Sequence, residues 1–390
     1  YIVAATRLPV AKKNGMFKNV RPDDMLAAVI KAVVAQVPGV DPARIGDVIV
    51  GCAMPEAEQG MNVARIGLLL AGLPITVPGI TINRFCSSGV QAVADAANQI
   101  RLGLADVMIA AGTESMSVMP QMMGNKMAMN PAIFTDENIG IAYGMGLTAE
   151  KVARQWNISR EQQDAFALAS NQKACAAIAA GHFKAETTPY AIRESLPDLK
   201  SGEIKLRERI AEVDEGPRAD ASLERLGKLK PVFHARGSVT AGNSSQMSDG
   251  AGAVMLVSEK VLKEHNLTPL ARFAGYAVGG VAPEIMGIGP IAAIPKVLAQ
   301  VGITQDQLDW IELNEAFAAQ SIAVMQELGI NPDKVNPLGG AIALGHPLGA
   351  TGAIRIATAV HGLRRTGGKY GMVTMCIGTG MGAAGIIERV

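Results

Sequence analysis

The chain has 390 residues, which is enough for two or three domains and for a hydrophobic core that is stable without disulfide bonds. Its 36 Lys and Arg residues nearly balance its 35 Asp and Glu residues, so the overall charge predicts no nucleic-acid or anionic-membrane partner, and 4% aromatic content is too little for base stacking. The four cysteines include no C-x-x-C pair, which argues against zinc and a disulfide framework and favours a reducing, intracellular compartment.

Short apolar runs along the chain predict buried β-strands, and segments with helical periodicity lie between them. Strands that alternate with helices in this way indicate an α/β protein with mostly parallel sheets. The apolar run at 66–80 is broken by Pro74 and Pro78 and is too short to cross a bilayer, so we expect no membrane insertion. The predicted strands lie at residues 2–5, 47–50, 106–111, 253–257, 372–375 and 384–388.

Two segments share the apolar spacing i, i+3, i+4, i+7, i+10, one after Gly89 and the other after Gly352. This spacing places apolar side chains on one face of a helix. A reactive side chain, Cys86 or His346, precedes each segment, and a strand with a glycine-rich end follows. The pattern predicts two similar halves whose helix N-termini take corresponding positions, although unrelated α/β units can share it.

Residues 116–237 differ in composition from the flanking sequence and are predicted to form an insertion. They begin with a methionine-rich stretch, continue with charged helical sequence and include a polar run at 200–230. Methionine is flexible and apolar, so these side chains could line an acyl-chain pocket or, as the plainer interpretation, pack the insertion. They are Met116, Met119, Met122, Met123, Met127 and Met129.

Cys86 stands immediately before one of the predicted helices. A thiol at a helix N-terminus feels the positive end of the helix dipole, so we expect a lowered pKa and a good nucleophile there. Backbone N–H groups at the same place could hold an oxyanion. The alternative is that Cys86 is a small buried apolar residue, as free cysteines usually are.

His346 lies in the glycine-rich stretch 336–352, where the backbone is expected to approach another group closely. Its imidazole could activate a thiol or donate to an oxyanion. The remaining histidines lack this setting and are predicted to be surface or packing residues. They are His182, His234, His265 and His361.

Two further candidates stand at the ends of predicted strands. Cys376 precedes a glycine loop and could donate and accept a proton, or could simply be a buried residue beside a tight turn. The loop is not a dinucleotide fingerprint, because a strand rather than a helix follows it. Asn314 could position a water or bind a carbonyl group, although a helix N-cap is an equally good interpretation.

Together these stretches resemble the motif set of the thiolases, nearly from end to end and in the same order. The resemblance implies the thiolase fold: two similar βαβαβαββ-type α/β halves packed in α/β/α/β/α layers, with an inserted loop domain. The implied domains are 1–115 with 238–265, the insertion 116–237, and 266–390. The matching stretches are Arg84–Gly89, Val239–Ser245, Ser248–Ala251, Asn314–Ala318, Gly339–Gly352 and Cys376–Gly380.

The resemblance also implies the chemistry, which is cleavage of a 3-ketoacyl-CoA by CoA or the reverse Claisen condensation. Cys86 would be the acylated nucleophile, Cys376 the acid and base at carbon, and His346 the group that activates Cys86. His346 and a water held by Asn314 would stabilise the enolate, and the N–H groups of Cys86 and Gly378 would form a second oxyanion hole. CoA would be a co-substrate, with no metal or permanently bound cofactor.

The family pattern places CoA along five residues of this chain. Ser245 would lie on the pantetheine side, Arg218 near the nucleotide, and Met145, Ala316 and Phe317 along the channel. Arg218 could instead belong to a solvated charged loop.

Gly144 stands where short-chain biosynthetic thiolases usually carry His, which favours a degradative 3-ketoacyl-CoA thiolase of fatty acid β-oxidation over an acetoacetyl-CoA thiolase. The second cysteine argues against a decarboxylating condensing enzyme. A non-catalytic acyl-CoA-binding relative would be expected to have lost Cys86, His346 or Cys376. Further expectations are a homodimer or homotetramer, a multifunctional β-oxidation partner, and a bacterial cytoplasm.

Overall fold

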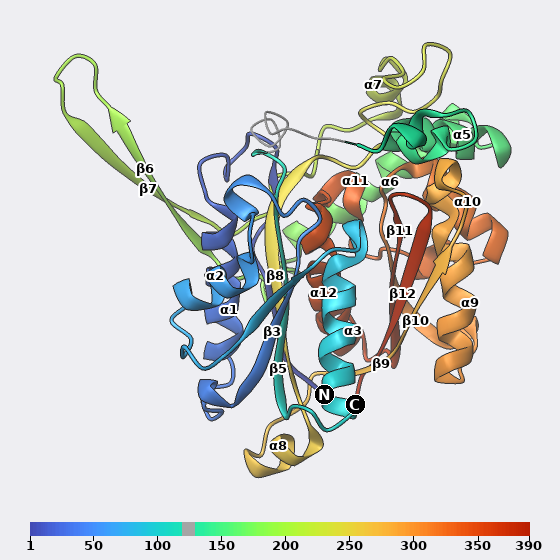
Figure 1. Cartoon of the computed structure of the whole chain (residues 1–390). Helices are drawn as coiled ribbons and strands as arrows, with labels where there is room; N and C mark the ends of the chain where they lie inside the picture. The colour runs from blue at the N-terminus through green and yellow to red at the C-terminus, as the bar shows by residue number, and fades with distance from the viewer. Residues whose placement is uncertain (119–128) are drawn as a thin grey trace.

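The computed structural model describes residues 1–118 and 129–390, and its core consists of two mixed β-sheets with helices around and between them (Figure 1). The first sheet has the order β1-β8-β5-β3-β4, and the short β2 pairs with β8. Its strands are β1 (Ile2–Arg7), β2 (Ala11–Lys12), β3 (Ile45–Gly51), β4 (Gly79–Ile82), β5 (Val107–Ser115) and β8 (Ser248–Val257).

The second sheet repeats the plan of the first. Its order is β9-β12-β11-β10, and Ile311 of β10 forms a further parallel bridge to Val335, at the place that β4 takes in the first sheet. This correspondence confirms the predicted internal repeat. The strands are β9 (Arg272–Gly280), β10 (Leu308–Leu313), β11 (Tyr370–Ile377) and β12 (Met381–Glu388).

The expectation of mostly parallel sheets is wrong. Strands β8 and β12 run antiparallel to both of their neighbours, while β3 pairs in parallel with β4 and β5, and β10 with β11. The physical reason is clearest at β12, which follows β11 after a three-residue turn. So short a connection allows only an antiparallel partner, because a parallel one needs a crossover.

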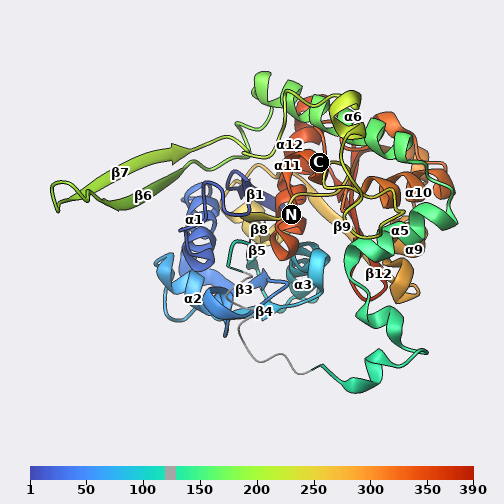
Figure 2. The ribbon, with the colours of Figure 1, turned by 90° about the horizontal axis from the view of Figure 1, so that it is seen from above.

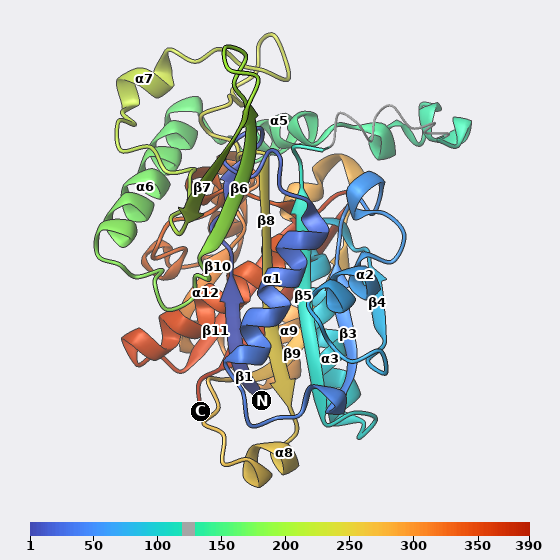
Figure 3. The ribbon, with the colours of Figure 1, turned by 90° about the vertical axis from the view of Figure 1, so that its left-hand side faces the viewer.

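The helices form three layers around the two sheets (Figures 1 and 3). Helices α3 and α12 lie between the sheets, α1 and α2 cover the outer face of the first, and α9 and α10 cover the outer face of the second. The bounds are α1 (Pro22–Ala35), α2 (Val63–Leu70), α3 (Ser88–Arg101), α8 (Glu259–Glu264), α9 (Gly289–Val301), α10 (Ala318–Leu328), α11 (Ala341–Leu344) and α12 (Thr351–Thr366).

The two central helices meet at their N-terminal turns through two glycines. A Cβ on Gly352 would overlap the backbone of Gly89 and Val90, and a Cβ on Gly89 would overlap the backbone of Ala353. No side chain can yield there, because the obstacles are main-chain atoms. The contact therefore requires glycine in both helices and brings the segments that precede them, which hold Cys86 and His346, to the same region.

One helical run, 283–301, is long and apolar enough to cross a membrane by length and composition. Its α9 part packs against β9 and β12, with Ala293, Ile294 and Val297 buried in the core of the second half. This is the packing of a core helix on a sheet.

The predicted insertion contains α5, α6, α7 and the hairpin β6–β7, most of it above the ends of the sheets in the view of Figure 1. In its methionine-rich stretch, Met116 is buried and Met129 is half exposed, whereas Met119, Met122, Met123 and Met127 lie outside the described residues. The bounds are α5 (Met145–Gln155), α6 (Arg160–Ala179), β6 (Tyr190–Pro197), β7 (Ile204–Ala211) and α7 (Leu223–Gly227).

Candidate active site

Cys86 lies in a short 3-10 turn, η3 (Phe85–Ser87), between β4 and α3. The preceding Phe85 has a φ of +44°, a region that non-glycine residues rarely adopt. Local hydrogen bonds hold this turn: Phe85 N–H donates to Asn83 Oδ1 at 2.8 Å, and the Ser88 hydroxyl donates to Phe85 O at 2.7 Å. The thiol is thus held in a turn that has one strained residue and is fixed by local hydrogen bonds.

The expected lowering of the Cys86 pKa is wrong. Burial, with a smaller contribution from the charge of Glu114, raises the pKa of the thiol to about 11, although an N–H donated by Gly378 acts in the opposite direction. Desolvation of a thiolate therefore outweighs the helix end, whose dipole acts only at short range. At neutral pH the resting nucleophile is a thiol, and it needs a base as it attacks.

His346 follows Gly345, which has a φ of +91° and no room for a Cβ beside Ser248. The imidazole is almost fully buried, and burial, together with the charge of Arg355, lowers its pKa to about 3. Its ring is therefore neutral at physiological pH and able to accept a proton. The turn η3 packs against η9 (Leu348–Ala350) and α12, the elements that follow His346.

Both ring nitrogens of His346 have partners. Nε2 lies 3.3 Å from Asn314 Nδ2, and Nδ1 lies 2.7 Å from Thr351 Oγ1. An amide nitrogen can only donate, so Nε2 accepts and the ring proton lies on Nδ1, where it is donated to Thr351. This tautomer leaves the lone pair at Nε2.

Asn314 is not a helix N-cap. Helix α10 begins at Ala318 with Phe317 in the cap position, whereas Asn314 continues the β10–β11 pairing by donating its N–H to Thr374 O at 2.9 Å. Its side chain is buried, and within the described part of the chain Oδ1 has no hydrogen-bond partner. A buried, unpaired carbonyl oxygen beside His346 is well placed to bind a water or a substrate group.

Cys376 lies at the end of β11 and is fully buried beside Ala316 and Phe317 in a small apolar cluster. Burial and the proximity of Cys86 raise the pKa of its thiol. Cys376 is thus a thiol at rest and can act as a proton donor. The next turn brings the N–H of Gly378 to the sulfur of Cys86.

Two buried carboxylates accept hydrogen bonds from the backbone on either side of His346, and neither was predicted from the sequence. Glu114 accepts the N–H groups of Gly349 and Ala53, each at 2.8 Å, which ties the turn after His346 to the first half. Glu315 accepts the N–H of Ile342 at 3.1 Å and so holds the chain before His346. The available signal in both cases was an acidic residue at the end of a predicted buried strand.

Four of the residues predicted to contact CoA lie close to these thiols. Ala316 and Phe317 belong to the cluster of Cys376, and the sulfur of Met145 lies 3.6 Å from the Cβ position of Gly378. Ser245 donates its N–H to Ala316 O at 2.9 Å. These four residues are therefore brought together with the two cysteines.

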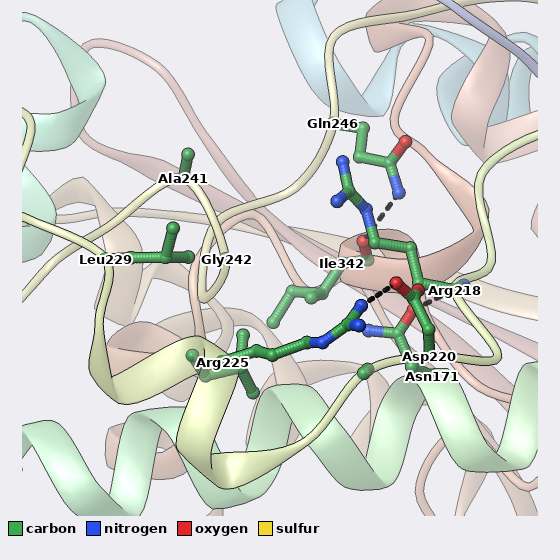
Figure 4. A pocket seen from close by; sticks show the side chains of 11 residues that line it. Asn171, Arg218, Asp220, Arg225, Leu229, Ala241, Gly242, Gln246 and Ile342 are labelled. Atoms are coloured by element: carbon green, nitrogen blue, oxygen red, sulfur yellow. Dashed lines mark hydrogen bonds and ion pairs between the residues drawn. The ribbon is translucent and has the colours of Figure 1, made fainter.

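Arg218 lies in a separate pocket of about 200 Å³ (Figure 4). The pocket combines the basic side chains of Arg218 and Arg225 with Asp220, to which Arg225 is paired. Gln246 lines the same pocket, and its backbone oxygen accepts the N–H of His346 at 3.2 Å. Gln246 thus connects the basic pocket with the main chain of His346.

Within residues 1–118 and 129–390, no three His, Cys, Asp or Glu side chains form a group that could hold a metal ion.

Comparisons with known proteins agree along the whole chain. The family model for the N-terminal domain of thiolases matches residues 1–260, and the model for the C-terminal domain matches residues 267–389. A 3-ketoacyl-CoA thiolase of Bacillus subtilis is 48% identical, with 99% of this chain and 98% of the relative covered. A beta-ketoadipyl-CoA thiolase of Pseudomonas aeruginosa is 45% identical, with 100% and 99% covered. The crystal structure of the Bacillus anthracis acetyl-CoA acetyltransferase superimposes with a TM-score of 0.89 at 40% identity, covering 100% of this chain and 98% of that one.

Proposed function

This chain belongs to the thiolase family, and we propose that it is an acyltransferase that cleaves 3-ketoacyl-CoA with CoA, giving acetyl-CoA and a shortened acyl-CoA. The observation that carries the proposal is the meeting of two thiols, a neutral imidazole and an unpaired amide oxygen at the ends of β4, β10 and β11. Acyl transfer through a cysteine needs a nucleophilic thiol and a base, and cleavage of a carbon–carbon bond needs in addition a proton donor to carbon and groups that bind the enolate oxygen.

In the proposed first half-reaction, Cys86 Sγ attacks the 3-keto carbon while Nε2 of His346 takes the thiol proton. The N–H groups of Cys86 and Gly378 stabilise the tetrahedral oxyanion. The bond between C2 and C3 then breaks, which leaves an acyl group on Cys86 and the enolate of acetyl-CoA. Cys376 protonates C2, while the protonated His346 and a water on Asn314 bind the enolate oxygen.

In the second half-reaction, the thiol of a new CoA attacks the acyl-cysteine. Its proton passes to the Cys376 thiolate, and the departing sulfur of Cys86 recovers its proton from His346. All three groups return to their resting states, so the cycle needs no external acid or base. The covalent intermediate predicts ping-pong kinetics.

We further propose that CoA extends from the thiols past Met145, Ser245, Ala316 and Phe317 to Arg218. What supports this course is the link that Gln246 makes between the pocket of Arg218 and His346. A cation at the far end suits the phosphates of the nucleotide.

The physiological substrate is proposed to be a 3-ketoacyl-CoA of fatty acid β-oxidation rather than acetoacetyl-CoA alone. The residue at 144 supports this, because Gly144 stands where the short-chain enzymes usually carry His, and with no side chain at this exposed position nothing here narrows the approach to the site. Synthesis or cleavage of acetoacetyl-CoA is the second candidate, and the structural likeness to an acetyl-CoA acetyltransferase favours it.

We also propose that the chain divides into three parts: 1–115 with 238–265, 116–237, and 266–390. We propose that it forms a homodimer or homotetramer and binds a multifunctional β-oxidation partner, in the cytoplasm of a bacterium. Support for the division comes from β8, which joins the first sheet although it follows the insertion in sequence.

The decisive experiment is intact-mass spectrometry after a brief incubation with acetoacetyl-CoA, followed by peptide mapping. We expect one acetyl adduct, on Cys86. A folded, CoA-binding protein without an adduct would contradict the proposal. Rates on 3-ketoacyl-CoA substrates of increasing chain length would then separate the two candidate substrates.

A further inference from the structure

A buried ion pair lies next to the groups that hold the ring of His346. Helix α12 lies in the middle of the molecule, between the two sheets, and packs against β10 (Figure 2). Asn314, which continues β10, and Thr351, which begins α12, contact the two sides of the ring. Glu312 lies two residues before Asn314 on the same face of the strand, and Arg355 lies one helical turn after Thr351. The strand and the helix therefore bring Glu312 and Arg355 together beside the imidazole.

The pair is enclosed and has few partners. Arg355 Nη1 lies 3.5 Å from Glu312 Oε2, and the two side chains are 4% and 1% exposed. The indole N–H of Trp310 donates to Glu312 Oε1 at 2.7 Å. Among the residues that the structure describes, Glu312 is the only carboxylate within 4.0 Å of the Arg355 guanidinium. A buried cation with one such partner depends strongly on whether that partner is charged.

Glu312 is a carboxyl group that can change its charge near neutral pH. Burial raises its pKa to about 7, although Arg355 and the hydrogen bond from Trp310 act in the opposite direction. The negative charges of Glu186 and Glu315 add to the rise. Arg355 faces Glu312 from α12, Glu186 from the segment after α6, and Glu315 from the end of β10. Below about pH 7 the pair therefore carries the positive charge of Arg355, and above it the pair is neutral.

The charge of this pair acts on the imidazole. His346 becomes a cation when it takes the proton of a thiol, and the positive charge of Arg355, together with burial, already lowers the pKa of His346. An ionised Glu312 offsets the charge of Arg355 at the ring, whereas a protonated Glu312 does not. The strength of His346 as a base therefore follows the protonation state of Glu312.

We propose that Glu312 is a positioning residue for the acylation step, because through Arg355 it sets how readily His346 takes the proton of Cys86. The inference rests on the proposed function, in which His346 is the base. The rate of acylation should rise roughly tenfold as Glu312 ionises, with an inflection near pH 7. Cys86 does not supply this inflection, because the pKa of its thiol is raised to about 11.

The test measures one step, which is transfer of an acetyl group from acetyl-thionitrobenzoate, an activated thioester, to Cys86 of the full chain. Rapid quenching and intact-mass spectrometry give its rate from about pH 5.5 to 9. Glu312→Gln keeps the size of the side chain and an oxygen that accepts hydrogen bonds, but it cannot ionise. This variant should lack the inflection and keep the low-pH rate of the unaltered chain at every pH.

A double variant separates charge from packing. Glu312→Gln combined with Arg355→Gln removes the cation as well, so nothing opposes the imidazolium, and acylation should regain the high-pH rate of the unaltered chain without an inflection. Asp214→Asn is the matched control, since it removes a buried carboxylate that pairs with Arg7 at 2.7 Å and is not among the groups that act on Glu312 or His346. It should keep the inflection.

The possible outcomes distinguish this inference from the proposed function. No acetyl adduct at any pH in the unaltered chain would contradict the function itself. An adduct that forms at a rate without an inflection near pH 7, an inflection that survives in Glu312→Gln or is lost in Asp214→Asn, or a double variant no faster than Glu312→Gln would overturn the inference alone. If Glu312→Gln does not fold, the double variant decides by comparison with the unaltered chain: an inflection near pH 7 that persists in it overturns the inference.

Discussion

Thr351 Oγ1 lies 2.7 Å from Nδ1 of His346, on the side of the ring opposite Asn314. The hydroxyl can hold the tautomer whose Nε2 accepts the proton of Cys86. Thr351→Val keeps the shape of the side chain and removes this hydrogen bond, so kcat should fall by about tenfold, with little change in KM. Thr351→Ser should restore most of the rate. Loss of activity in Thr351→Ser equal to that in Thr351→Val would show that packing, rather than the hydroxyl, matters.

The two cysteines should separate into two chemical roles. Cys86→Ala removes the attacking sulfur, so no acyl adduct should form from any thioester. Cys376→Ala retains Cys86 and His346 and should accept an acyl group from an activated thioester, but it cannot protonate carbon and should not turn over 3-ketoacyl-CoA. Mass spectrometry of both variants after acylation checks this assignment, which equal loss of labelling would contradict.

The alkylation of Cys86 should depend on pH as expected of a desolvated thiol. Since its pKa is raised to about 11, the thiolate fraction and the rate of iodoacetamide labelling should still be rising at pH 9 to 10. His346, with a pKa lowered to about 3, should add no step near pH 6. A plateau in the labelling rate below pH 8 would indicate a thiolate–imidazolium pair instead.

The glycine at the start of α12 should be intolerant of any side chain. Gly352→Ala would place a methyl group on main-chain atoms of α3, and we expect a loss of about 3 kcal/mol in the free energy of unfolding. Gly227→Ala is the control, because a Cβ there meets nothing within 4 Å. Urea denaturation of both variants measures the difference, and similar midpoints would disprove close packing at Gly352.

Gly144 offers a test of chain length. Gly144→His would occupy the open space at the start of α5, so the ratio of kcat/KM for long over short 3-ketoacyl-CoA should fall by roughly tenfold. Activity on acetoacetyl-CoA should be retained. A uniform fall for all chain lengths would mean that this position lies outside the acyl pocket.

The candidate nucleophile, base and acid could be found from the sequence because each lies beside a glycine turn. Glycine clusters are local, and so is the apolar spacing of α3 and α12, which revealed the repeated halves. The direction of β8 was not visible in the same way, because strand patterns carry no information about the neighbouring strand, whereas the short connection from β11 to β12 already required an antiparallel pair.

The supports of the site were missed for a related reason. Glu114 reaches Gly349 across 235 positions of sequence, and no local pattern encodes such a contact. The same limit explains the error in the pKa of Cys86: its helix was visible, whereas the burial that outweighs the helix dipole is created by β11 and η9 from the other half.

The Gly89–Gly352 contact joins two halves that are alike in structure but supply different reacting groups. The segment before α3 supplies the sulfur, whereas the equivalent segment before α12 supplies the imidazole. The reacting groups thus come from both halves and meet at the interface between them, and neither half holds a complete set. A displacement of one half relative to the other would therefore move the nucleophile away from its base while leaving both folds intact.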